Sequence, residues 1–193
     1  MNKQERTRKT IEATMQIIAE KGMDRFSVIQ SAERAGINEA LIYRDFVSKE
    51  NLLYSCYIDY VIRLGDVYNQ IVFSNNMDII SKIELVWRAF FRFLLQNNYR
   101  TLFYEQFRSS SYAAAAKKKA RLPLQNTHYM SFVNQIVAEL KLDQNQIDIL
   151  GILLMDGSLL FARRIIQGEM EDKKENIDRI WAMLSGGVKG MFA

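Results

Sequence analysis

Apolar residues recur at helical spacing along most of the chain, with few interruptions. The first such segment, from about residue 5 to residue 21, places Ile11, Met15 and Ile18 on one face, and Gly22 follows it. An apolar residue at every third or fourth position predicts an amphipathic helix, and glycine is favoured where a helix ends. The sequence therefore begins with a predicted helix.

Five more helix boundaries follow soon afterwards. They are a capping box at Ser27 and Gln30, a glycine break at Gly36, an N-cap at Asn38, a helix end near Phe46 and an N-cap at Ser48. Polar side chains at these positions accept hydrogen bonds from the first free amides of a helix. The pattern predicts two short helices, then a long one from Ser48 to about residue 72, with Val47 and Leu52 packed as a hydrophobic staple.

The remaining pattern predicts helices almost to the end of the chain. The expected segments are 77–96, 99–108, a helix opened by Pro123 and ending near Leu140, one capped by Asp143 and ending near Gly168, and one after Asn176 that ends near Met191. Residues 109–119, rich in Ser, Ala and Lys, are expected to form a surface connection, with a partly helical form as the alternative because alanine favours helix. We predict an all-α fold of about nine helices, with domains at 1–47 and 48–193.

Composition agrees with a globular helical protein. Of the 193 residues, 49% are hydrophobic, 25% are charged and one is proline. The net charge of +4 is too small to imply nucleic acid by itself. Lys3, Arg6, Arg8 and Lys9 form either a mobile basic arm or a solvated tail. The chain has one cysteine, a polar beginning and no long apolar run, from which we expect a cytoplasmic protein.

Two short helices around a glycine-containing turn, between a preceding helix and a long following one, predict a helix-turn-helix. A generic helical bundle with tight turns fits the same local signals. Specific residues favour the first interpretation, because the segment resembles the TetR-type DNA-binding domain at Gly22, Phe26, Ser27, Val28, Ala32, Ala35, Gly36, Ile37, Tyr43, Phe46, Ser48, Lys49, Glu50 and Leu52. Ser31, Ala40 and Leu41 depart from the usual pattern, and Glu39 and Asp45 bring acid to the recognition helix.

This resemblance implies a regulator that binds a pseudo-palindromic DNA operator, most simply a repressor. Phosphate contacts are expected from hydroxyls, cations and helix N-termini, here Ser27, Tyr43, Ser48 and Lys49. Base contacts are expected from the recognition helix, at Asn38, Glu39, Ala40, Leu41 and Arg44. Arg6 and Arg8 are candidates for a minor groove. Tyr43 as a core aromatic and Lys49 as a solvated charge are the alternatives.

The second part of the chain is rich in aromatic residues. With the resemblance, this predicts a cavity for a small apolar or aromatic effector, lined by Tyr60, Leu64, Tyr68, Trp87, Phe91, Phe103, Phe107 and Tyr129. Helical spacing explains many of these residues equally well as core. The long helix beginning at Ser48 would connect this cavity to the DNA-binding segment.

The last two long helices carry apolar residues interleaved with glycine, alanine and serine. In TetR-like proteins these helices form the dimer, so we expect a homodimer interface at Ile147, Leu150, Leu154, Phe161, Ile177, Ile180, Trp181, Leu184 and Val188.

An enzyme is not predicted. His128 and Cys56 are in no recognisable catalytic or metal-binding spacing, and no glycine-rich phosphate loop is present. We therefore predict no cofactor and no metal. The alternative function is that of a helical dimeric interaction protein without specific DNA binding.

Overall fold

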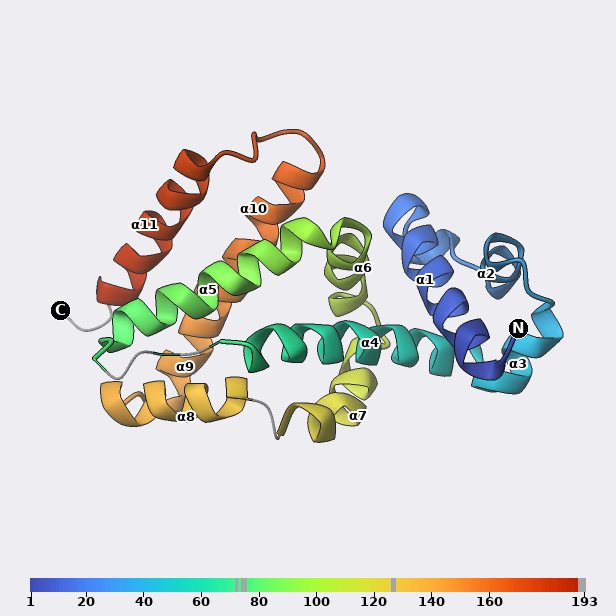
Figure 1. The fold of residues 1–193 in the computed structure, drawn as a ribbon, viewed down its shortest axis with the longest axis horizontal. Coiled ribbons are helices and arrows are strands. Elements are labelled where there is room, and N and C mark those ends of the chain that lie inside the picture. The colour runs from blue at the N-terminus through green and yellow to red at the C-terminus, as the bar shows by residue number, and fades with distance from the viewer. Residues whose placement is uncertain (72, 74–75, 126–127, 191–193) are drawn as a thin grey trace. The chain divides into compact units, whose positions relative to one another are not determined.

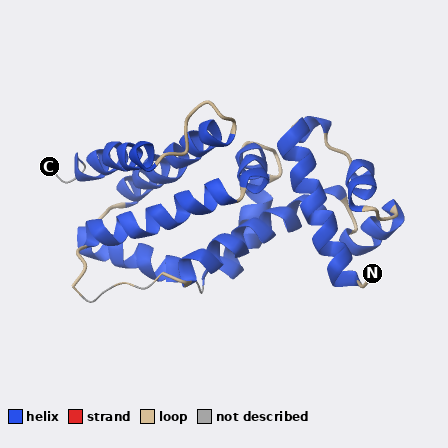
Figure 2. Cartoon of the chain, turned by 45° about the horizontal axis from the view of Figure 1, so that its top comes forward, coloured by secondary structure: helices blue, strands red, loops and turns tan. Residues whose placement is uncertain are grey.

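Helices account for all the regular structure in the part of the chain that the computed structural model describes (Figures 1 and 2). The described residues are 1–71, 73, 76–125 and 128–190, with the side chains of 121–125, 128, 129, 188 and 189 left aside. Within these ranges, no helix combines the length and the apolar character needed to cross a membrane. The chain divides into two units, Met1–Arg63 with Tyr99–Gln125 and Leu64–Asn98 with Asn126–Ala193. The all-α prediction is confirmed.

The first unit begins with a three-helix arrangement whose ends are those that the capping residues predicted. Its elements are α1 (Lys3–Lys21), a 3-10 turn η1 (Met23–Arg25), α2 (Val28–Ala35) and α3 (Glu39–Phe46). The Ser27 and Gln30 capping box is present at the start of α2. Gly36 adopts the left-handed conformation at the end of α2, with φ of 64°. The glycine is needed there because a Cβ atom makes this backbone conformation costly.

A tight γ-turn joins α3 to α4 (Lys49–Asn69). Val47 has φ of 70° and ψ of −42°, and the Ser48 amide donates to the Phe46 carbonyl at 2.8 Å. Positive φ is rare for a β-branched residue, and this turn is a strained one. The Val47 side chain is 75% exposed, so the predicted staple between Val47 and Leu52 is wrong.

The first unit also includes α6 (Asn98–Arg108) and α7 (Ala113–Gln125). Gln106 on α6 fastens the end of α1, since its Nε2 donates to the Ile18 carbonyl at 2.9 Å and its Oε1 accepts from the Met23 amide at 3.0 Å. The connection expected at 109–119 is helical from Ala113 onward, where it belongs to α7, so its partly helical form is the one observed. Pro123 lies in the last turn of α7 and does not open a helix.

The second unit consists of the end of α4 and the remaining helices. These are α5 (Ile79–Gln96), α8 (His128–Leu140), α9 (Gln144–Gly151), α10 (Gly157–Ile166) and α11 (Lys174–Gly190). A π-helical turn η2 (Ile152–Asp156) joins α9 to α10 without a break, and the Gly157 amide donates to the Ile152 carbonyl five residues back. In Figures 1 and 2, α5 lies beside α10.

Candidate functional site

The recognition helix α3 turns an apolar face inward and a mixed face outward. Ile42 and Phe46 are buried, whereas Ala40, Tyr43 and Arg44 are exposed. Tyr43 is 45% exposed, which excludes its interpretation as a core aromatic. Glu39 and Leu41 are half-buried. The exposed positions share one helical face, so their side chains can approach a partner together.

Three helix N-termini near this face are capped by polar side chains. Ser27 Oγ accepts from the Gln30 amide at 3.3 Å, Asn38 Oδ1 from the Ala40 amide at 2.8 Å, and Ser48 Oγ from the Asn51 amide at 3.2 Å. Helix N-termini carry partial positive charge and attract phosphate groups. The predicted N-caps are therefore confirmed as caps, and their contacts with DNA stay a prediction.

Lys49 lies at the first turn of α4 and is anchored on the helix-turn-helix. Its Nζ donates to the Phe26 carbonyl at 3.1 Å and lies 5.2 Å from the centre of the Phe26 ring. An ammonium group has three donors, so this bond still allows a hydrogen bond to a phosphate. These contacts with Phe26 hold the Lys49 ammonium group in one direction, whereas the side chain of a solvated lysine would be free to rotate.

Arg6 and Asp45 form a buried ion pair between α1 and α3. Arg6 Nε lies 2.6 Å from Asp45 Oδ2, Nη2 lies 3.0 Å from Oδ1, and the two side chains are 8% and 3% exposed. The expectation of a mobile basic arm is therefore corrected, because α1 begins at Lys3 with Asn2 as its N-cap. Arg6 is therefore not expected to contact DNA, because its guanidinium is bound to Asp45.

The ion pair also explains why the recognition helix can carry an acidic residue, Asp45, on its inner side. The hydrogen bond from Arg6 is the main cause that lowers the pKa of the Asp45 carboxyl. Arg44 is near the same carboxylate, with Nε 3.8 Å from Asp45 Oδ1, but its side chain is 63% exposed. The negative charge of Asp45 thus faces the protein interior, and Arg44 supplies the outward charge.

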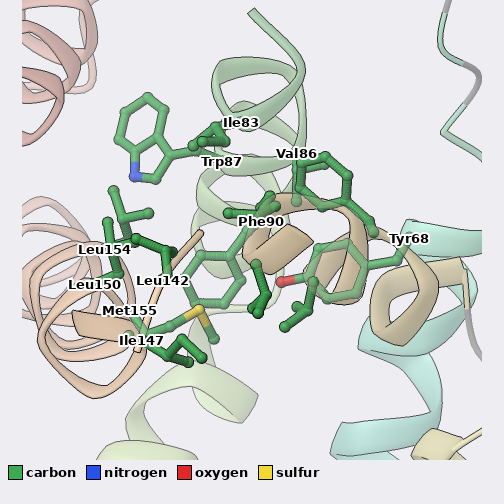
Figure 3. Close-up of a pocket in the computed structure, with 15 residues that line it drawn as sticks. Tyr68, Ile83, Val86, Trp87, Phe90, Leu142, Ile147, Leu150, Leu154 and Met155 are labelled. Carbon is green, nitrogen blue, oxygen red and sulfur yellow. The ribbon is translucent and has the colours of Figure 1, made fainter. Parts of the chain in front are cut away.

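The second unit contains an apolar cavity of about 150 Å³ (Figure 3). Its walls come from the end of α4, from α5, from α8 and from the continuous helix of α9 and η2. The lining residues are Tyr68, Ile83, Val86, Trp87, Phe90, Phe132, Val133, Ile136, Val137, Leu142, Ile147, Leu150, Gly151, Leu154 and Met155. A concave apolar site of this kind is suited to a small molecule.

A chain of hydrogen bonds joins the cavity wall to the helix that bears the π-turn. The indole Nε1 of Trp87 donates to Ser158 Oγ at 2.7 Å, and Ser158 Oγ donates to the Leu154 carbonyl. Ser158 is fully buried. Because the hydroxyl is both acceptor and donor, the indole N–H of Trp87 and the hydroxyl of Ser158 are satisfied inside the protein.

The structure places the predicted effector residues in two different regions. Tyr68 and Trp87 line the cavity. Tyr60, Phe103 and Phe107 belong to the core of the first unit, where Tyr60 stacks on Tyr104 with ring centres 4.4 Å apart. Of the others, Leu64 and Phe91 are buried without lining the cavity, and the Tyr129 side chain lies outside the described residues. Helical spacing marked these aromatics as inward-facing but did not indicate which core they enter.

The predicted interface residues mostly face the interior of the second unit. Ile147, Leu150 and Leu154 line the cavity. Ile180, Trp181 and Leu184 are buried, Phe161 and Ile177 are half-buried, and the Val188 side chain lies outside the described residues. These helices expose a different set of large apolar residues, namely Ile149, Ile152, Leu160 and Met183. Sequence reasoning missed this exposed set because it follows the other face of the same helices.

The described residues offer little for catalysis. Burial raises the pKa of the Cys56 thiol well above its ordinary value, which keeps the sulfur protonated. No group of His, Cys, Asp and Glu side chains suited to hold a metal ion is present in the described ranges. The His128 side chain lies outside them.

The fold and the exposed recognition helix define a helix-turn-helix DNA-binding protein. Residues 11–56 match the family described as bacterial regulatory proteins, tetR family. The chain therefore carries the DNA-binding segment of the tetR family of regulators at residues 11–56. Among curated proteins, none matches the chain in sequence.

Solved structures show the same fold over nearly the whole chain. A TetR family transcription regulator from Marinobacter aquaeolei VT8 is 22% identical, with 94% of each chain covered and a TM-score of 0.73. A putative tetR family regulator from Shewanella sp. PV-4 is 18% identical, with 93% of this chain and 95% of the other covered and a TM-score of 0.76. The fatty acid degradation regulator FadR from Bacillus halodurans is 19% identical, with 97% and 98% covered and a TM-score of 0.72.

Proposed function

We propose that the protein binds a pseudo-palindromic operator as a homodimer and represses transcription until a small apolar or aromatic effector releases it. The observation that carries the DNA-binding part is the outward face of α3, where Ala40, Tyr43 and Arg44 are exposed while Asp45 is neutralised from within. One short helix contacts too few base pairs for useful specificity, and two-fold symmetry doubles the contacts.

The DNA-binding part is tested by selecting operators from a random duplex pool and measuring affinities by fluorescence anisotropy. Arg44→Ala is expected to relax preference at one base pair in each half-site, at a cost of about 1 to 3 kcal/mol. Arg179→Ala, which removes an exposed arginine on α11, is the control and is expected to change nothing. A protein that binds no duplex even at low salt would be a helical interaction protein instead.

The effector part rests on α4, which contributes to both units. Its first turn carries Lys49 beside the helix-turn-helix, and Tyr68 in its last turn lines the cavity. A ligand that moves Tyr68 would act on the helix that holds Lys49. Linkage requires that operator and effector change one another's affinity by the same factor, typically about 5- to 150-fold.

Titrating effector into the free protein and into its operator complex measures the factor by which the operator changes the affinity for the effector. Identical effector affinity in the two titrations would contradict release by the effector while leaving DNA binding intact.

A further inference from the structure

Among the described residues that line the cavity in the second unit, none has a charged side chain. Hydrocarbon groups supply nearly all of this described lining, and the phenol of Tyr68, directed inward in Figure 3, is the one side-chain hydroxyl among these residues. The indole N–H of Trp87 is taken by Ser158. A charged group brought into such a site loses its hydration and finds no ionic partner among the lining residues, which is strongly unfavourable.

The size of the cavity limits the ligand as well. An apolar cavity of similar volume, lined by Leu, Ile and Phe in an engineered protein, holds benzene. The cavity here is also about 150 Å³ and is lined by the same kinds of residue. A molecule much larger than a single ring would have to displace wall residues such as Phe90, which is 2% exposed and close-packed.

We propose that the effector, or the part of it that the cavity encloses, is an uncharged apolar group of about one aromatic ring or a short hydrocarbon chain. This inference rests on the proposed function and narrows it, because it excludes carboxylate and ammonium groups from the cavity. The cavity discriminates between charged and uncharged ligands through the cost of desolvating a charge, so the absence of charge matters more for affinity than the shape of the ring.

Matched one-ring compounds test the proposal at pH 7. Toluene and benzyl alcohol are uncharged, whereas benzoate and benzylammonium carry opposite charges on a similar frame. Calorimetric titration is expected to show binding of the uncharged compounds and about 100-fold weaker binding of both charged ones. Benzoate or benzylammonium binding as tightly as benzyl alcohol would overturn the proposal, and so would the failure of both uncharged compounds to bind.

The place of binding is tested by a matched pair of variants on α9. Ile147→Trp fills the cavity, whereas Asn145→Trp adds the same side chain at an exposed position two residues away. The first is expected to lose at least about 10-fold in toluene affinity, and the second to bind like the parent protein. Equal affinity in both variants would place the ligand elsewhere and overturn the proposal.

Methyl NMR of the unsubstituted protein provides a second measurement, should Ile147→Trp fold poorly. Met155 lines the cavity and Met23 belongs to the first unit. Toluene is expected to shift the Met155 methyl signal and leave that of Met23 in place; a Met155 signal that does not move would overturn the proposal. If the uncharged compounds bind in the cavity without changing operator affinity, the proposed class of cavity ligand is supported, but the proposal that such a ligand releases the operator is contradicted. The two proposals are therefore tested separately.

Discussion

At the scale of single residues, the buried pair of Arg6 and Asp45 shows how the recognition helix accommodates an acid. The carboxylate accepts two hydrogen bonds from the guanidinium and is almost completely buried. A pKa that is lower in the folded state than in the unfolded state means that folding favours the ionised form. The resulting stability is present above the ordinary pKa of 3.8 and is lost as the pH falls through the lowered value.

Asp45→Asn should therefore lower the midpoint of thermal unfolding by several degrees at pH 7, because it leaves a buried arginine unpaired. The difference from the parent protein should shrink as the pH falls below about 4 and become smallest below the lowered pKa of Asp45, where the protonated carboxyl and the amide are alike in shape and charge. Thermal unfolding at a series of pH values measures it. Asp24→Asn, at an exposed acid of the same unit, is the control. A difference that stays constant down to low pH would contradict the assigned ion pair.

Ser31 is a polar residue in the core, at a position where an aliphatic residue is usual in TetR-type proteins. The structure supplies the reason, since its Oγ lies 2.8 Å from Thr14 Oγ and both residues are fully buried. One hydroxyl donates to the other, so each has a hydrogen-bond partner inside the core. The departure in sequence is thus compensated by a partner on α1 that no local pattern indicates.

A double-mutant cycle tests this pair. Ser31→Ala and Thr14→Val should each cost about 1 to 3 kcal/mol of unfolding free energy, because each leaves one buried hydroxyl unpaired. The double variant should cost less than the sum of the two. Urea denaturation measures all four proteins, and strictly additive losses would show that the hydroxyls do not interact.

At the scale of elements, the γ-turn between α3 and α4 places a strained valine beside the recognition helix. Val47→Gly should raise the unfolding free energy by about 1 kcal/mol, since glycine adopts positive φ without strain and the exposed side chain contributes little burial. Lys141→Gly, at the other described non-glycine residue with positive φ (51°), should change stability less because lysine is unbranched. A loss of stability in Val47→Gly would argue against the turn.

Local chemistry was sufficient to predict most helix ends. Ser27 with Gln30, Asn38, and Asp143 act as caps where the sequence placed them. The helix α7 was missed because proline favours the first turn of a helix, whereas Pro123 lies in the last turn of α7. Its signal was the spacing of Ala113, Ala116 and Ala120, all of which are buried.

At the scale of the whole molecule, apolar periodicity showed that the last helices have inward faces but not what those faces enclose. Leu154 was expected at a dimer interface and lines a cavity, because both environments select the same apolar side chains. Tyr60 and Tyr68 are eight residues apart on one helix, yet one is core of the first unit and the other lines the cavity. Such assignments depend on tertiary packing that spacing does not encode.

The exposed set at Ile149, Ile152, Leu160 and Met183 gives a better test of dimer formation. Ile152→Asp should yield a folded monomer that binds its operator far more weakly, because Ile152 is 62% exposed and a charge there opposes burial against a second copy. Ile62→Asp, at a 48% exposed isoleucine on α4, should remain dimeric. Sedimentation equilibrium measures the mass, and circular dichroism checks folding. A dimeric Ile152→Asp would place the interface elsewhere.

The π-turn at η2 has a consequence for how insertions and deletions act on this chain. Its hydrogen bond spans five residues where a regular helix spans four, so the turn holds an extra residue. Deleting one residue between Gly151 and Gly157 would remove this extra residue and restore a regular helix whose two flanks keep the faces they have here. If the turn became regular with the extra residue still present, one flank would rotate against the other by about 100°, and the cavity-lining residues of α9 and the buried residues of α10 would face different directions. A relative whose helix is regular throughout should therefore align with this chain through a gap inside 151–157.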